Sequence, residues 1–256
     1  MSSCDYLDKM PAGELSLEAM FSDRVHVEEW LAGAYSAIPR NYMHMLRYYD
    51  IYADDYSPNT GWEAYDWDGI SKIKGNWDSK SSWRGDYWNE LPRRIRSCYI
   101  LINNIHPLGD ELPEREVNLI KAESQFLIAY YYYLLVNTYG AVSLLKEEVD
   151  LNASAESLML GQSTYDEAID WIDSQLMDAA GKLPPYYTEN MKYGRATSVM
   201  CLAVRARMLL FAASPLVNGN QRPEYVNFKN DKGEPVFNST YQPEKWQRAT
   251  GEAPAM

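Results

Sequence analysis

The run "KAESQFLIAYYYYLLVNTYGAVSLL", residues 121 to 145, places four consecutive tyrosines inside a segment with helical character. Successive residues of an α-helix are about 100° apart, so the side chains of Tyr130 to Tyr133 point to most of the helix circumference. No single apolar stripe holds all four rings. Each phenol also needs a hydrogen-bond partner or water when it is buried. The run therefore predicts a helix that other helices contact on several sides.

The composition permits a sizeable core and disfavours nucleic acid as a partner. The chain has 256 residues, of which 46% are hydrophobic, enough for one large domain or two modest ones. Its net charge of −12 repels phosphate backbones, and no Lys/Arg-rich run offsets that repulsion. The 21 tyrosines and 8 tryptophans outnumber the 5 phenylalanines. Rings with a polar tip are common at binding surfaces.

The cysteines and histidines predict neither a disulfide framework nor a metal site. The three cysteines are odd in number, and Cys98 and Cys201 fall in helical patterns far apart in the chain. The three histidines lack HExxH or paired Cys/His spacing: His26, His44 and His106. We therefore expect no metal and no cofactor. No apolar run reaches the roughly 18 residues that span a bilayer.

The first residues, "MSSCDYLDKMP", leave two interpretations open. Cys4 follows two small residues and precedes an acidic, linker-like segment, as does the lipidated cysteine at the end of a lipoprotein signal. The apolar region that normally precedes such a cysteine is missing here. Cys4 is therefore either a lipidation site whose leader was trimmed or an ordinary exposed thiol.

Helical periodicity predicts the elements of the first half of the chain. Ser16 starts a helix that Pro39 closes, with five inward side chains: Phe21, Val25, Trp30, Leu31 and Tyr35. A shorter helix is expected within residues 41 to 56, and a further helix from near Trp83 or Trp88 to Ile105. Between them, residues 57 to 82 are rich in Gly, Ser, Asn and Asp and have no sustained period. This stretch predicts a long loop, and long loops in compact domains are often functional.

The second half of the chain shows clearer helix boundaries. Glu114 to Tyr139 predicts the longest helix, with Gly140 as its C-terminal cap. Two capped amphipathic helices are expected within residues 163–184 and 194–219, and a helix starts near Pro243. Residues 225–238 are compatible with one small β-hairpin. The fold class is mainly α, with helix pairs after residue 114 that suggest an α-solenoid-like stack without a clean repeat of about 34 residues.

Aromatic and polar side chains alternate in the long loop, where a ligand has access. Flat rings can lie against the C–H faces of sugars while Asn, Asp and Arg bond the hydroxyls. The candidate ligand-binding residues are Trp62, Tyr65, Trp67, Asn76 and Trp77. The competing interpretation is that the tryptophans anchor the loop to the helical body. Trp83 and Trp88 abut the next helix, so we expect these two to be core residues.

Several segments, in this order, resemble the RagB/SusD family of outer-membrane nutrient-binding lipoproteins. They are "CDYLDKMPAGELSLEAMF" with "LAGAYSAI", "RRIRSCYILINNI", "KAESQFLIAYYYYLLVNTYGAVSLL", "STYDEAIDWIDSQLMDAAGKLP", "GRATSVMCLAVRARMLLFAASPLVNG" and "WQRAT". The chain departs from the family pattern at Ile128, where Arg is usual, at Ser143, where Pro is usual, and at Tyr99, where Asn is frequent. These departures affect local packing and loop shape.

The resemblance implies a domain plan. Residues 1–256 would form one SusD-like domain of tetratricopeptide-like helix pairs with long irregular loops, lacking the C-terminal part found in family members about twice this length. Residues 1–15 would be a tether that Cys4 anchors through lipid, and residues 57–82 the ligand-binding loop. Tyr130 to Tyr133 would be structural.

The resemblance also implies a function, namely capture of glycan at the outer-membrane surface and delivery to a SusC-like TonB-dependent transporter, without catalysis. Clustered loop acids such as Asp54, Asp55 and Asp68 carry no nucleophile or metal motif beside them. Some members of the family are thought to take up peptides, so the ligand class stays open. The alternative is a generic helical-repeat scaffold that binds a peptide or protein partner.

Overall fold

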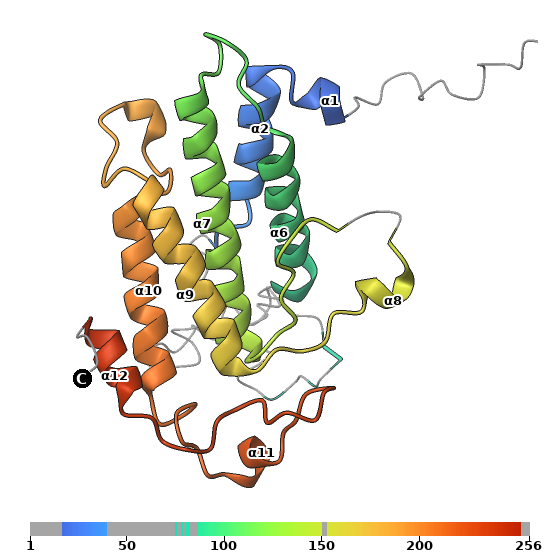
Figure 1. Cartoon of the computed structure of the whole chain (residues 1–256), viewed down its shortest axis with the longest axis vertical. Helices are drawn as coiled ribbons and strands as arrows, with labels where there is room; N and C mark the ends of the chain where they lie inside the picture. Colours follow the sequence, from blue (N-terminus) through green and yellow to red (C-terminus); the bar gives the residue numbers. More distant parts are fainter. Residues whose placement is uncertain are drawn as a thin grey trace, which may run out of the picture.

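The computed structural model describes residues 17–39, 75, 78, 80–81, 87–149 and 153–251, and this part of the chain is predominantly helical (Figure 1). The helices in chain order are α1 (Leu17–Met20), α2 (Arg24–Tyr35), α6 (Tyr87–Asn104), α7 (Glu114–Tyr139), α8 (Ala155–Leu158), α9 (Tyr165–Lys182), the 3₁₀-helix η2 (Asn190–Lys192), α10 (Ser198–Ala213), α11 (Pro223–Val226) and α12 (Glu244–Thr250). No strand occurs within these ranges. The predicted mainly α class is therefore confirmed.

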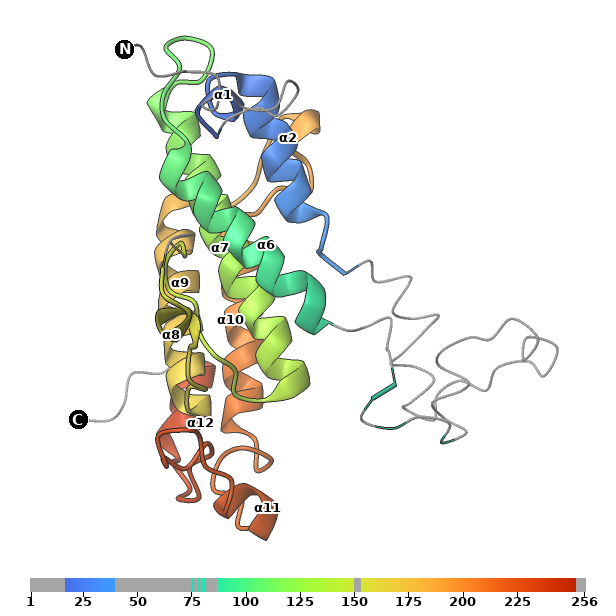
Figure 2. The same ribbon diagram turned by 90° about the vertical axis from the view of Figure 1, so that its right-hand side faces the viewer.

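The long helices stack in the order of the sequence. α2 packs against α6 and α7, α6 against α7, α7 against α9, α9 against α10, and α10 against α12. Figures 1 and 2 show α6, α7, α9 and α10 running side by side along the long axis of the molecule. The α7 helix lies between α6 and α9, so neighbours cover it on more than one side, as the tyrosine run predicted.

The four tyrosines of α7 are held from several directions. Tyr131 is fully buried, and its hydroxyl donates to the carbonyl of Ala34 at the end of α2. The hydroxyl of Tyr132 accepts from Leu145 N at 2.6 Å, and its ring meets Trp171 of α9 edge-on, with centroids 5.1 Å apart. Tyr130 and Tyr133 are half-buried and flank this pair. The run therefore serves packing, as expected.

Helix boundaries follow local capping chemistry. Gly140 ends α7 with φ 76°, a backbone conformation that suits glycine. Thr164 and Glu167 form a reciprocal capping box at the start of α9, and Thr197 caps α10 through the amide of Met200. Pro92 is accommodated inside α6, near its start. These boundaries agree with the sequence pattern.

The single helix predicted from Ser16 to Pro39 is wrong, because Asp23 interrupts it. The carboxylate of Asp23 accepts from the amides of Val25 and His26 and starts α2 at Arg24. The buried face of α2 then consists of residues spaced by four and three: Val27, Leu31 and Ala34. Val25 falls in the exposed first turn, with 60% of its surface accessible, contrary to the prediction that it points inward.

The predicted hairpin at residues 225–238 is also wrong in its extent. Tyr225 and Val226 belong to the short helix α11, and only one antiparallel bridge forms, between Lys229 and Pro235. The backbone amides of Asn230 and Val236 donate to the carbonyls of Glu234 and Phe228, and the carboxamide oxygen of Asn230 accepts from the amides of Lys232 and Glu234, so side-chain and backbone bonds together close a short turn.

A buried charge ties three parts of the chain together. Glu123 of α7 is 0% exposed and receives two hydrogen bonds from Arg195, one from Nε at 2.9 Å and one from Nη2 at 2.6 Å. The hydroxyl of Tyr35, at the end of α2, donates to the same carboxylate at 2.6 Å and accepts from the amide of Ala196. Burial, reinforced by Glu123, raises the pKa of Tyr35, so its hydroxyl stays a donor. The network joins α2, α7 and the connection before α10.

We predict that Glu123→Gln lowers the free energy of unfolding by about 3 kcal/mol, because Arg195 keeps its charge and loses its buried partner. Urea denaturation followed by circular dichroism measures the loss. The matched control is Glu90→Gln, which breaks an exposed pair with Arg94 on α6 and should cost roughly 0.5 kcal/mol or less. Equal losses for the two variants would show that the buried pair contributes no more to the free energy of unfolding than the exposed pair.

Burial raises the pKa of Tyr132 to about 12, which predicts a loss of stability at high pH. An unfolded tyrosine ionises near pH ~10, so between about pH 10 and 12 the folded chain binds more protons than the unfolded chain. The stabilisation is complete below about pH 10 and is lost as pH rises through this window. Urea midpoints measured from pH 9 to 12 should fall less steeply for Tyr132→Phe than for wild type. If the urea midpoints of wild type and Tyr132→Phe fell equally steeply with pH, Tyr132 would not be a source of this pH dependence.

Candidate functional site

The predicted ligand-binding residues Trp62, Tyr65, Trp67, Asn76 and Trp77 lie outside the described residues, as does the predicted lipidation site Cys4. Their roles therefore stay predictions. Two surfaces of the described part bear on binding, and they lie at opposite ends of α7.

The first surface is an exposed aromatic pair at the start of α6, which in the sequence follows the tryptophan-rich segment (residues 62–83). Trp88 is 55% exposed, and its ring meets Tyr139 edge-on with centroids 5.5 Å apart. The hydroxyl of Tyr139 accepts from the amides of Tyr87 and Trp88 at 3.1 and 3.3 Å, so the last residue of α7 caps the first turn of α6. The pair is held in place while the indole remains accessible.

The prediction that Trp88 is a core residue is wrong. Trp88 shares a helix face with the buried Leu91 and Ile95, but it stands in the first turn of α6. Its partner Tyr139 is the final residue of α7, so α7 does not continue past this level to cover the indole. A side chain on the core-facing side of a helix therefore stays exposed when the neighbouring helix ends before it can cover that side chain.

The second surface is an open groove between the first turns of α7 and the connection that follows α9, at the other end of the molecule (Figure 1). Its volume is about 990 Å³. Its lining includes Asn118, Leu119, Pro184, Tyr186, Tyr187 and Thr188. Tyr186 is 70% exposed, whereas Tyr187 is half-buried and its hydroxyl lies 3.5 Å from the carboxylate of Glu123.

A smaller hollow of about 660 Å³ adjoins this groove, since Asn118 and Lys182 line both. Side-chain amides cross it between helices: Gln125 of α7 donates to Gln175 of α9 at 2.9 Å and to Asp178 at 2.8 Å. The two hollows together follow α7 along the side where it faces α9. Both hollows are lined by a mixture of polar and apolar side chains.

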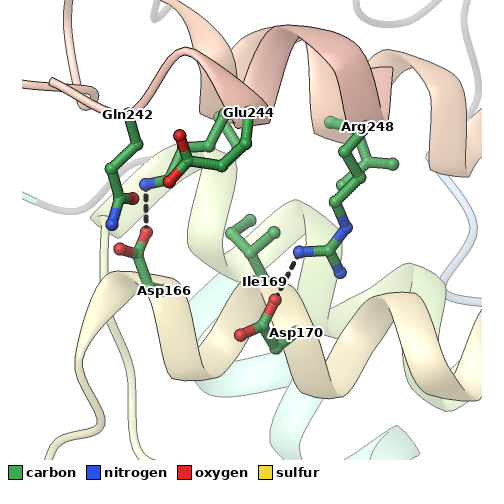
Figure 3. A pocket seen from close by; sticks show the side chains of 9 residues that line it. Asp166, Ile169, Asp170, Gln242, Glu244 and Arg248 are labelled. Atoms are coloured by element: carbon green, nitrogen blue, oxygen red, sulfur yellow. Dashed lines mark hydrogen bonds and ion pairs between the residues drawn. The ribbon is translucent and has the colours of Figure 1, made fainter. Parts of the chain in front are cut away.

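A third hollow, of about 200 Å³, lies where α12 packs against α9 and α10. Here α12 lies across α9 and α10, and Figure 3 shows side chains of α12 reaching the acids of α9. Lys245 pairs with Asp166, and Arg248 pairs with both Asp170 and Asp173. Because a cation neutralises each of these carboxylates, they do not form a free acid and base pair.

The described residues offer neither a metal site nor an activated thiol. Within the ranges that the structure covers, no group of three or more His, Cys, Asp and Glu side chains could hold a metal ion. Burial raises the pKa of Cys98 to about 12 and that of Cys201 to about 11, so both thiols are unreactive. In the same ranges, no helix is both long enough and apolar enough to span a membrane.

Sequence reasoning missed the groove entirely, although one signal was present. The run "LPPYYTEN" ends α9 with two prolines, which prevents the helix from continuing and leaves adjacent rings on an irregular connection. Asn118 carries no such signal, because it is an ordinary polar position on α7. Only the packing of the connection onto α7 brings Asn118 and Tyr186 to one surface.

A protein-family comparison matches residues 5–210 to a SusD-like family described as "Starch-binding associating with outer membrane". A search of curated proteins found no significant relative. Among solved structures, a protein named BT4246 is similar with a TM-score of 0.73 and 27% identity, over 90% of this chain and 38% of that protein. The chain therefore spans about two fifths of the length of that relative.

Other solved structures share the fold. A SusD-like protein (BF3747) from Bacteroides fragilis NCTC 9343 matches with a TM-score of 0.59 and 25% identity, over 80% of this chain and 38% of that one. A protein titled "Laminarin binding SusD-like protein" matches with a TM-score of 0.54 and 16% identity, over 75% of this chain and 41% of that one. Since the family match covers most of the chain, the protein belongs to the SusD-like family.

Proposed function

We propose that this protein binds glycan at the surface of an outer membrane, capturing oligosaccharide or polysaccharide fragments and handing them to a SusC-like TonB-dependent transporter. The family description, which names starch binding and the outer membrane, supports this proposal. The matched residues 5–210 include the whole tryptophan-rich segment.

The observation that carries the proposal is the exposed indole of Trp88. A large ring that is 55% exposed at a fixed position is a platform against which the C–H face of a sugar can stack. Tyr139 braces it, so a ligand meets a ring whose freedom is already restricted. In the sequence, Trp88 closely follows residues 57–82, in which we propose that Trp62, Tyr65, Trp67, Asn76 and Trp77 complete the site.

Four carboxylates at the packed contacts between helices are already ion-paired, which supports binding over hydrolysis. Glycoside hydrolysis needs two carboxyl groups free to act on either side of one bond. Glu123 is paired with Arg195, and the α9 acids Asp166, Asp170 and Asp173 are paired with cations. We therefore propose a binding protein without catalytic activity.

We further propose that Cys4 carries lipid and that residues 1–15 form a tether to the outer leaflet. One acyl chain gives weak, reversible attachment, whereas the multiple acyl chains of a bacterial lipoprotein hold firmly. A tethered binding protein remains near its transporter, which raises the local concentration of captured ligand there.

The glycan site is tested by replacing the rings one at a time. Trp62→Ala, Trp67→Ala and Trp88→Ala should each weaken binding by about 1 to 2 kcal/mol, the effect of losing one stacked aromatic face. Isothermal titration against a panel that includes maltoheptaose and laminarihexaose measures the change. Tyr193→Ala is the matched control, because Tyr193 is 68% exposed on the connection after α9, at the other end of the bundle.

Two outcomes would contradict this site or this function. A glycan that binds wild type and all three tryptophan variants equally would move the site elsewhere. Peptide binding without any glycan binding would favour a helical-repeat scaffold for a peptide or protein partner.

Anchoring and partner are tested together in membranes of the native host, with the protein expressed from its own gene. Wild type should fractionate with the outer membrane and co-purify with a large β-barrel protein. Cys4→Ala should release it to the soluble fraction, because the acyl anchor supplies most of the membrane affinity. Unchanged fractionation of Cys4→Ala would refute the anchor, and recovery of soluble partners alone would refute the transporter.

A further inference from the structure

The groove between α7 and the connection after α9 has the size of a ligand site. Its volume of about 990 Å³ lies at the upper end of the range of roughly 300 to 1,000 Å³ that is usual for small-molecule sites. Leu119, Leu183 and Pro184 supply apolar surface, while polar side chains surround them. This surface lies away from Trp88 and serves no role in the site proposed above.

The charges around the groove are largely neutralised within the protein. Lys192 pairs with Glu189 at 3.2 Å, and Lys182 pairs with Asp178. Glu116 pairs with Arg24 of α2 at 2.8 Å. The remaining charges, on Glu114 and Arg115, have opposite signs on adjacent residues. The lining thus carries as many acidic as basic side chains and most of them are already paired, so the groove favours a neutral ligand.

Two neutral polar side chains of the groove remain available for a ligand. The carboxamide of Asn118 and the hydroxyl of Tyr186 have no hydrogen-bond partner within the described part of the chain, and Tyr186 is 70% exposed. Thr188 adds a hydroxyl whose one contact, to Glu189, is long at 3.4 Å. A carboxamide can donate to and accept from hydroxyl groups, and an exposed ring can take the C–H face of a pyranose.

We propose that this groove is a second saccharide-binding site, with Tyr186 as its stacking platform and Asn118 as its hydrogen-bonding side chain. The ligand class is a neutral glycan, the same polymer that the Trp88 end binds, so this inference rests on the proposed function. Tyr187 forms the floor and contacts the buried Glu123 network, which keeps the connection in place against α7.

The two sites are suitably spaced for one polymer. Asn118 lies one turn into α7 and Tyr139 is its last residue, so at 1.5 Å per residue the sites are about 30 Å apart along the helix. A polysaccharide held at one end is at high effective concentration for the other, which strengthens retention without any new contact. An oligosaccharide of six or seven sugars, even fully extended, barely reaches from one site to the other and cannot fill both, so it should occupy each one separately.

The test uses the full chain and two lengths of one glycan, either maltoheptaose with soluble starch or laminarihexaose with laminarin, chosen by which of them binds. Isothermal titration should show that each wild-type chain binds two molecules of the oligosaccharide. The double variant Asn118→Ala/Tyr186→Ala should bind one. Affinity electrophoresis should show the double variant retained by the polymer at least tenfold more weakly. Tyr193→Ala, on the same connection but outside the groove lining, should match wild type.

Each outcome decides the inference. In the Trp88→Ala background the first site is about tenfold weaker, so an event that keeps its wild-type affinity there and is weakened by Tyr186→Ala supports the second site. A single event in wild type, or a double variant equal to wild type in both assays, overturns the second site while the proposed function stands. If neither glycan pair binds wild type at all, the proposed function is contradicted for these neutral glucans and the second site falls with it. Circular dichroism confirms that each exposed-residue variant is folded.

Discussion

The ion pair between Glu123 and Arg195 is the constraint on which the rest of the bundle depends. A carboxylate that is 0% exposed is tolerable only with a bonded cation, so Arg195 must stand against α7. This requirement fixes the connection between α9 and α10, which would otherwise be a loop on the surface. Through Tyr35 the same carboxylate holds the end of α2. The position of the groove at the start of α7 follows from this one interaction.

Much of the fold could be predicted because the signals are local. The extent of α7 follows from an unbroken apolar pattern that Gly140 ends, and the capping residues Thr164 and Thr197 mark the starts of α9 and α10. The failures have a different origin. At Asp23 a side-chain cap outweighed the helical period of the surrounding residues. In the expected hairpin, the helix α11 takes Tyr225 and Val226, which leaves one antiparallel bridge, between Lys229 and Pro235.

The binding surfaces were less predictable because exposure is not a local property. Trp88 has the spacing of a core residue, and only the end of α7 at Tyr139 leaves its ring accessible. Asn118 and Tyr186 lie on different elements, and tertiary packing alone brings them to one groove. Sequence periodicity identifies the face of a helix on which a residue lies. It does not show where along that face the neighbouring helix stops.

The distribution of charge also bears on the kind of glycan that suits this protein. The chain carries a net charge of −12, and the arginines and lysines at its packed joints, such as Arg195, Arg205 and Arg248, are engaged with carboxylates inside the bundle. The excess negative charge therefore repels an acidic polysaccharide at long range. The exposed rings of Trp88 and Tyr186 are proposed to bind through their π-faces, which need no charge on the ligand. A neutral polymer meets both surfaces without a Coulombic penalty, so the charge of the protein and the exposure of its rings favour the same ligand class.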